Sequence, residues 1–199
     1  MKPWLQVVLC FSLLGMGCHG SKVSGERYPS KADFKPAAVR TDATTLLLAG
    51  TPYPVTVKPF ERGDDIRFDF VSHDEVFESE LYEQTAAMFF VIEAADERYV
   101  PAVPILRFPL TIGDGWKWEG EIVSSGISYK AGAIITTGSE DLYFSGMKHH
   151  TVRVLVGISL QANPGKSPLE RELTFWFEPG KGIIKREFGS ASVREPSPW

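Results

Sequence analysis

Residues 150–161 read HTVRVLVGISLQ, and apolar side chains occupy alternate positions along most of this stretch. The alternating apolar set is Val152, Val154, Val156, Ile158 and Leu160. A period of two in β-branched residues is typical of a strand with one buried face and one solvated face. Half-buried strands of this kind pair in antiparallel sheets. The stretch therefore predicts one strand of an antiparallel sheet.

The same alternation recurs on both sides of this stretch. Its inward positions are Ile66, Phe68 and Phe70, then Trp116, Trp118 and Ile122, then Leu173, Phe175 and Phe177. Residues 88–92 (MFFVI) favour a buried strand over the alternative of a helix through residues 79–95. Turn sequences rich in glycine and proline separate the runs. The sequence therefore predicts an all-β fold of about ten short strands in an antiparallel, strongly curved sheet, whether half-barrel, open barrel or sandwich.

The N-terminal residues have the pattern of an export signal. Residues 1–18 read MKPWLQVVLCFSLLGMGC, in which Lys2 precedes an apolar run from residue 4 to residue 16. About 13 residues in a helix span roughly 20 Å, which is too short for a bilayer core of about 30 Å. We therefore expect a signal peptide over residues 1–17 and an exported mature chain.

Residues 13–18 (LLGMGC) resemble the lipobox of bacterial lipoproteins. The resemblance implies cleavage before Cys18, acylation of its thiol and attachment to a membrane through the lipid. The chain has two cysteines, and Cys10 would leave with the signal peptide, so the mature chain would hold one thiol and no internal disulfide. His19 stands where an Asp would resemble an inner-membrane retention signal, so the implied destination is the outer membrane. The alternative is a plain signal peptide that leaves a free thiol.

Composition divides the remaining chain into three parts. Residues 18–50 are rich in Ser, Lys, Pro, Ala and Gly, and we expect a flexible tether. The leucines at residues 46–48 would form a first strand or a docking turn. Residues 51–189 form the predicted β domain, and residues 190–199 a disordered tail.

Two segments of the β domain resemble uncharacterised bacterial exported lipoproteins. Residues 105–118 (ILRFPLTIGDGWKW) contain an apolar strand, FPL, GD and an aromatic pair, and residues 175–187 (FWFEPGKGIIKRE) have the form of the last hairpin of those proteins. The resemblance implies a curved β-sheet domain in the cell envelope and implies no activity. Both motifs also have structural explanations, because proline marks a strand edge or bulge and glycine permits tight turns.

Charge and motif content exclude several functional classes. The formal net charge is −4, and no cluster of Lys and Arg is present, which argues against nucleic-acid binding. His149 and His150 are adjacent, so they would point to opposite faces of a strand and could not share a metal ion. We expect them to be solvated loop residues. No nucleotide-binding glycine motif or hydrolase nucleophile motif occurs, and the sequence predicts no cofactor.

Carboxylates are concentrated in residues 61–83. Paired carboxylates can perform acid–base chemistry or bind calcium, but their spacing matches no calcium-binding loop. Glu78 and Glu80 are two residues apart and would share one face of a strand. The interpretation we favour is a solvated outer face.

Six aromatic residues could line the concave side of the curved sheet and contact a lipid or another hydrophobic ligand. They are Phe68, Phe70, Trp116, Trp118, Phe175 and Phe177. The favoured alternative is that they fill the core. The sequence thus predicts a non-enzymatic envelope lipoprotein with a binding or assembly role toward envelope proteins. The alternatives are a carrier of lipids or other hydrophobic molecules and an exported hydrolase.

Overall fold

A computed structural model describes the greater part of the chain. The described residues are 25–34, 43–48, 51–144, 146–161, 167–189 and 192–193. The predicted signal peptide of residues 1–17 and the predicted lipidation residue Cys18 lie outside them. No helix in the described part is long and apolar enough to cross a membrane.

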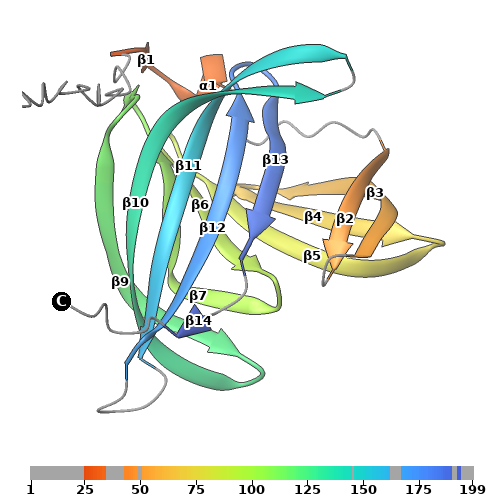
Figure 1. The fold of residues 1–199 in the computed structure, drawn as a ribbon, viewed down its shortest axis with the longest axis vertical. Helices are drawn as coiled ribbons and strands as arrows, with labels where there is room; N and C mark the ends of the chain where they lie inside the picture. The colour runs from red at the N-terminus through yellow and green to blue at the C-terminus, as the bar shows by residue number, and fades with distance from the viewer. Residues whose placement is uncertain are drawn as a thin grey trace, which may run out of the picture.

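Strands make up nearly all of the regular structure (Figure 1). The single helix among the described residues is α1 (Lys31–Phe34). The strands are β1 (Arg27–Tyr28), β2 (Ala43–Leu48), β3 (Thr51–Arg62), β4 (Asp65–Ser72), β5 (Glu75–Gln84), β6 (Met88–Ala94), β7 (Glu97–Arg107), β8 (Leu110–Thr111), β9 (Gly115–Ser124), β10 (Ile127–Phe144), β11 (Met147–Gln161), β12 (Leu169–Glu178), β13 (Gly182–Phe188) and β14 (Ser192–Val193).

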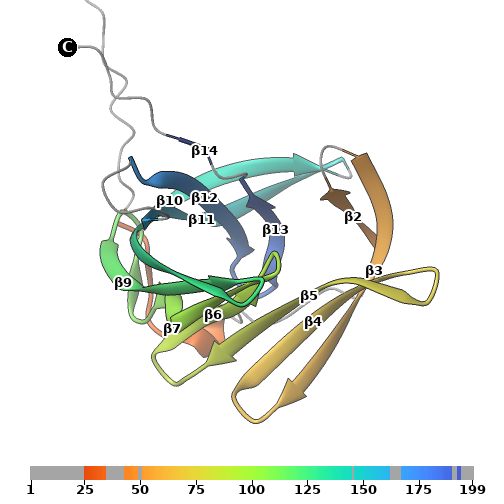
Figure 2. The same cartoon turned by 90° about the horizontal axis from the view of Figure 1, so that it is seen from below.

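Twelve strands form one continuous antiparallel sheet in the order β13-β12-β11-β10-β9-β7-β6-β5-β4-β3-β2, with β14 pairing β12. In Figure 2 the strands from β13 to β5 curl round a common interior, while β4, β3 and β2 extend to one side. The prediction of an antiparallel, strongly curved sheet is confirmed. The strand predicted at residues 88–92 is confirmed as part of β6, so the alternative helix is excluded.

The core lies on the inner face of the curl and follows the predicted alternation. In β11, Val152, Val154 and Val156 are buried, and Arg153 between the first two is exposed. Aromatic side chains from facing strands interlock across the interior. The ring of Phe89 on β6 lies edge-to-face with that of Phe177 on β12, with centroids 6.2 Å apart. Such packing buries large apolar areas and makes burial the main stabilising contribution.

The N-terminal segment of residues 25–34 packs on the domain, which corrects part of the predicted tether. Strand β1 pairs with β8, and the fully buried ring of Phe34 lies 5.8 Å from that of Phe177. The backbone N–H of Gly180 donates to the Phe34 carbonyl at 2.9 Å. Strand β2, also within the predicted tether of residues 18–50, pairs with β3. The first strand expected from the leucines at residues 46–48 is therefore confirmed. The flexible spacer does not include residues 25–34, because the rings of Tyr28 and Phe34 dock this mostly polar segment on the domain.

Strand β13 closes the curl through side chains instead of a second backbone ladder. Its backbone pairs with β12 in the described residues. Toward the opposite wall, the Arg186 guanidinium lies 3.8 Å from the ring centroid of Phe70 on β4 and forms an ion pair with Glu80 on β5. This contact places charged groups inside the curl, next to the candidate site.

The C-terminal residues 190–199 were predicted to be a disordered tail. Two of them form β14, which pairs with β12, so the prediction does not hold for residues 192–193.

Candidate functional site

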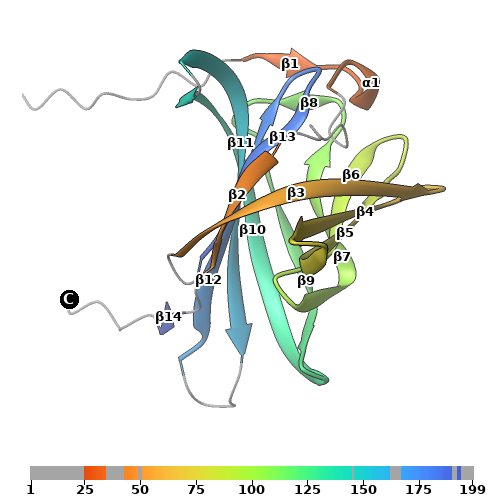
Figure 3. The ribbon, with the colours of Figure 1, turned by 90° about the vertical axis from the view of Figure 1, so that its right-hand side faces the viewer.

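A surface hollow of about 470 Å³ opens between β5, the β6–β7 turn and the β9–β10 turn. Figures 1 and 3 show the β9–β10 turn at the bottom of the molecule, with β1 and α1 at the top. The carboxylates that line the hollow are Glu78, Glu93, Asp96 and Glu97, and Arg98 is the one cation among its lining residues in the described chain. We call this feature the acidic hollow. Its charge favours a ligand with cationic groups.

Two carboxylates of the acidic hollow are influenced by arginines from the C-terminal strands, one through an ion pair and one through the electrostatic effect of a nearby charge. Glu97 at the start of β7 forms an ion pair with Arg171 of β12, and both side chains are largely buried. Burial raises the pKa of Glu78 above its ordinary value, and the nearby charge of Arg186 opposes this shift. Both arginines come from strands far along the chain, so the curl of the sheet brings the charges together.

Glu80 lies behind the acidic hollow and is completely buried. Its Oε1 is 2.5 Å from Arg186 Nε, and its Oε2 accepts a hydrogen bond from the Tyr82 hydroxyl at 2.8 Å. Burial raises the pKa of Glu80 to about 7, although the Arg186 charge lowers it. The predicted solvated outer face for Glu78 and Glu80 is therefore wrong. These residues share the inner face with Tyr82, because a distant arginine compensates their charge.

Tyr99 extends this buried polar cluster toward Glu97. Its side chain is 1% exposed, and burial raises its pKa, with Glu97 raising it further. The charge of Glu80 also contributes to the pKa of Tyr99, so the two buried groups influence each other electrostatically. A raised pKa at Glu78, on the wall of a hollow, suits either ligand binding or proton transfer.

Sequence reasoning did not single out Tyr82, Tyr99, Glu97, Arg171 or Arg186. One signal was available for part of this cluster. Glu80 is in register with the inward aromatic Tyr82, two positions along the same strand. A charged residue on an apolar face calls for a buried partner. Nothing in the local sequence identifies that partner as Arg186.

The six aromatic residues predicted to line a ligand-binding concavity lie in or against the packed core. Phe68, Phe70, Phe175 and Phe177 are at most 1% exposed, and Trp118 is also buried. Partly buried Trp116 packs against the core, and its Nε1–H donates to the Pro104 carbonyl at 2.7 Å. A second, open hollow of about 530 Å³ lies along β9, β10 and β11. Neither of the two hollows is lined by any of the six aromatics.

The adjacent histidines lie in β11, so the prediction of loop residues is wrong. Their predicted placement on opposite faces is confirmed, because His149 is buried and His150 is exposed. His149 Nδ1 lies 2.8 Å from Glu178 Oε2. In the part of the chain that the structure describes, no three His, Cys, Asp or Glu side chains are grouped so that they could hold a metal ion.

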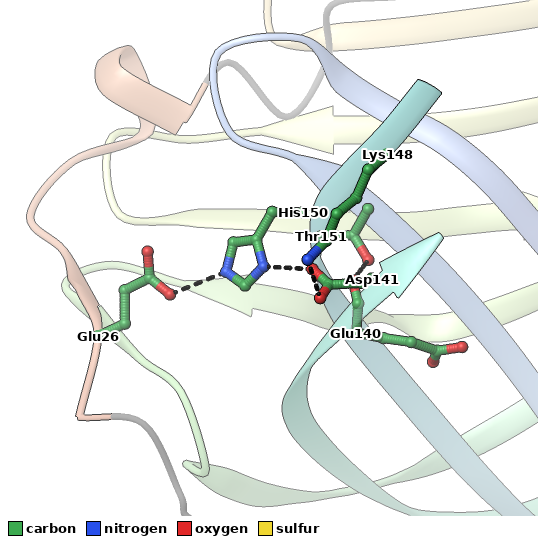
Figure 4. A network of polar contacts seen from close by, with 6 residues as sticks. All are labelled: Glu26, Glu140, Asp141, Lys148, His150 and Thr151. Carbon is green, nitrogen blue, oxygen red and sulfur yellow. Dashed lines mark hydrogen bonds and ion pairs between the residues drawn. The ribbon is translucent and has the colours of Figure 1, made fainter. Parts of the chain in front are cut away.

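His150 belongs to a polar network that fixes the N-terminal segment (Figure 4). Its Nδ1 lies 2.8 Å from Asp141 Oδ1 on β10, and its Nε2 lies 3.3 Å from Glu26 Oε2 just before β1. Lys148 Nζ contacts the other Asp141 oxygen at 2.8 Å. Both ring nitrogens of His150 face carboxylates, so both must carry a proton to donate. The bonds to Asp141 and Glu26 raise the pKa of His150.

Replacing His150 with Gln is expected to loosen β1. The pKa of His150 is raised in the folded state, so its stabilising contribution is complete below the ordinary pKa and is lost as pH rises through the folded value. Because the side chain is about half exposed, solvent screening keeps the effect below about 1 kcal/mol. Hydrogen exchange of the β1 amides should therefore be faster in the variant at about pH 6, and the difference should shrink at about pH 8.

The matched control for this prediction is His73→Asn in the β4–β5 turn. His73 has a φ of 50°, which Asn tolerates. This change should leave the exchange of β1 unaltered at both pH values. Equal exchange of β1 in the wild type and the His150 variant at low pH would show that the network does not hold the segment.

Comparison with known proteins gives limited similarity. No family model matches the sequence, and no curated protein matches it. Among solved structures, the chain is similar to the crystal structure of the hypothetical lipoprotein YmcC from Escherichia coli K12, with 10% sequence identity and a TM-score of 0.37. The similarity covers 69% of this chain and 72% of that one. A similarity this low gives no information about the role of this chain.

Proposed function

We propose that this chain is an exported protein, attached to a bacterial envelope membrane by lipid on Cys18, whose β domain binds a partner without catalysing a reaction. The observation that carries the proposal is the arrangement of the two ends of the domain. The N-terminal segment docks on one end through β1 and Phe34, and the acidic hollow opens at the other. An anchored domain would therefore present the hollow away from the membrane.

The short distance along the chain supports this orientation. Gly25, the first described residue, follows Cys18 by seven positions (25 − 18 = 7). Seven residues reach at most about 25 Å even when fully extended. An acylated Cys18 would thus hold the docked end of the domain near the bilayer surface. The outer membrane is the proposed destination in a cell with two membranes, because His19, and not Asp, follows the cysteine.

The binding role rests on the acidic hollow. Glu93 and Glu97 on its wall form ion pairs with Arg98 and Arg171, which leaves the carboxylates of Glu78 and Asp96 to face a ligand. The exposed apolar residues Val76 and Phe77 also lie on its wall. A ligand with cationic and apolar groups matches this combination. An envelope protein segment with such side chains is the partner we propose. The carrier alternative receives less support, because the aromatics predicted to line its cavity are packed together.

Mass spectrometry of the native protein tests the anchor. We expect the mature N-terminus to be Cys18 with the added mass of acyl chains, and a Cys18→Ser variant to accumulate with residues 1–17 still attached. Cleavage elsewhere, or an unmodified Cys18, would contradict the proposal. The same measurement reports what co-purifies. A stoichiometric free lipid bound to the folded domain would favour the carrier alternative.

A hydrolase is the second candidate, and Glu78 is the specific observation in its favour. Its carboxyl combines a position on the wall of a hollow with a pKa raised by burial, as in residues that transfer protons. Turnover of a chromogenic ester or glycoside by the purified mature chain, lost in Glu78→Gln but retained in Glu75→Gln outside the hollow, would favour this candidate over a binding role.

A further inference from the structure

The β10–β11 hairpin has an exposed apolar tip at the same end of the molecule as β1 and α1. Tyr143 near the end of β10 is 74% exposed, and Met147 at the start of β11 is 55% exposed. Figures 1 and 3 both place the hairpin tip and the N-terminal elements at the top of the domain. The contact between His150 and Glu26 joins the hairpin to the N-terminal segment directly.

We propose that Tyr143 and Met147 enter the interface of the lipid bilayer that carries the N-terminal anchor. This inference rests on the proposed acylation of Cys18. It adds a second point of membrane contact, and two points would fix the orientation of the domain where a single lipid attachment would leave it free to rotate.

The length of the chain supports this partner. Glu26 follows Cys18 by eight positions (26 − 18 = 8), which limits their separation to roughly 28 Å. Met147 precedes His150 by three positions on β11, or about 10 Å along the strand. The anchor and the tip can therefore reach the same membrane surface without any movement of the domain.

The form of the tip also suits a bilayer interface. Tyr143 lies opposite Lys148 in the ladder, so the two share one face of the hairpin. Met147 is displaced from Lys148 by one residue and lies on the other face. Apolar surface is thus exposed on both sides of the projecting tip, as expected for an element surrounded by lipid. Tyrosine is also favoured at membrane interfaces, where its ring is apolar and its hydroxyl remains hydrated.

Charge contributes little to the expected attraction between the hairpin tip and the membrane surface. The ammonium group of Lys148, beside the tip, is already paired with Asp141 at 2.8 Å. We therefore expect insertion into bilayers of zwitterionic lipid, without a requirement for anionic headgroups. This expectation separates the apolar contact proposed here from a basic patch that binds anionic lipids.

A spin label placed at the tip tests the proposal. The acylated mature chain would have no free thiol, so Met147→Cys would provide a single labelling site for a nitroxide. Ile127→Cys is the matched control, because Ile127 is 56% exposed at the opposite end of the domain. On phosphatidylcholine vesicles, the label at position 147 should collide several-fold more often with membrane-dissolved oxygen than with a water-soluble nickel chelate. The label at position 127 should show the reverse preference.

The possible outcomes separate this inference from the proposed anchor. A nitroxide at position 147 that stays accessible to the nickel chelate, on protein whose Cys18 is acylated and bound to vesicles, would overturn only the membrane contact of the tip. Strong dipolar broadening between labels at position 147 would identify a second copy of the chain as the occupant and would also overturn it. Protein without acyl mass that does not bind vesicles would overturn both proposals.

Discussion

Replacing Arg186 with methionine is expected to lower the free energy of unfolding by about 3–5 kcal/mol, measured by urea denaturation at about pH 8. Glu80 is completely buried, and Arg186 supplies the cation that faces its carboxylate at 2.5 Å. Without the guanidinium, the fold must either hold an unpaired charge or take up a proton at a pH where this is costly. The variant also loses the contact of Arg186 with the Phe70 ring, which helps to close the curl at β13.

Arg153→Met on the outer face of β11 is the control for this prediction. Arg153 also pairs with a glutamate, Glu140, but both side chains are more than one third exposed. A pair of this kind contributes about 0–1 kcal/mol. The double variant Glu80→Gln/Arg186→Met should recover part of the lost stability, because it removes the isolated buried charge. A loss in Arg186→Met no larger than that in Arg153→Met would contradict the role of the ion pair.

The strands could be predicted because their cause is local. In β11, each inward valine is followed by an outward residue, and this alternation is visible without knowing which strands are neighbours. The order of the strands and the closure of the curl at β13 depend on contacts between residues far apart along the chain. The spacing of apolar residues along the sequence does not predict that β13 contacts β4 and β5.

The candidate site was missed for the same reason. A glutamate within an acidic stretch suggests a solvated face. The burial of Glu80 depends on an arginine from β13. The tether was misjudged on composition. Residues 25–34 are mostly polar, yet Tyr28 and Phe34 form an edge-to-face pair with ring centroids 5.0 Å apart, next to the core. The average composition of a segment does not show that two aromatic rings in it are positioned to pack on the core.

The cluster behind the acidic hollow also links the proposed binding role to stability. Glu78 lines the hollow, and its charge raises the pKa of Glu80, which lies deeper in the fold. A cationic ligand held beside Glu78 would offset its negative charge. Binding of such a ligand would therefore lower the pKa of Glu80 and favour its ionised, Arg186-paired form. The buried charge of Glu80 can therefore respond to ligand binding at the acidic hollow and does not by itself indicate catalysis.

The free energy of unfolding should fall by about 3 kcal/mol between about pH 4.5 and pH 7 through Glu80 alone. Burial raises the pKa of this carboxyl from 4.5 to about 7, with Arg186 opposing the shift. The folded state therefore binds the proton more tightly than the unfolded state. The resulting stabilisation is complete below pH 4.5, declines as pH rises and is lost above the folded pKa. A glutamate whose pKa is lowered by a surface salt bridge has the opposite effect, because its contribution to the free energy of unfolding increases as pH rises.

Urea denaturation at about pH 5 and about pH 8 measures this dependence, and Glu80→Gln should remove it. Glutamine keeps the size of the side chain and an acceptor for the Tyr82 hydroxyl but cannot titrate, so the informative quantity is the change between the two pH values and not the absolute stability. Glu75→Gln, at an exposed position of the same strand, is the matched control and should retain the wild-type dependence. If Glu80→Gln and the wild type lose the same stability between the two pH values, Glu80 is ionised throughout that range in the folded protein, and its pair with Arg186 outweighs the cost of its burial.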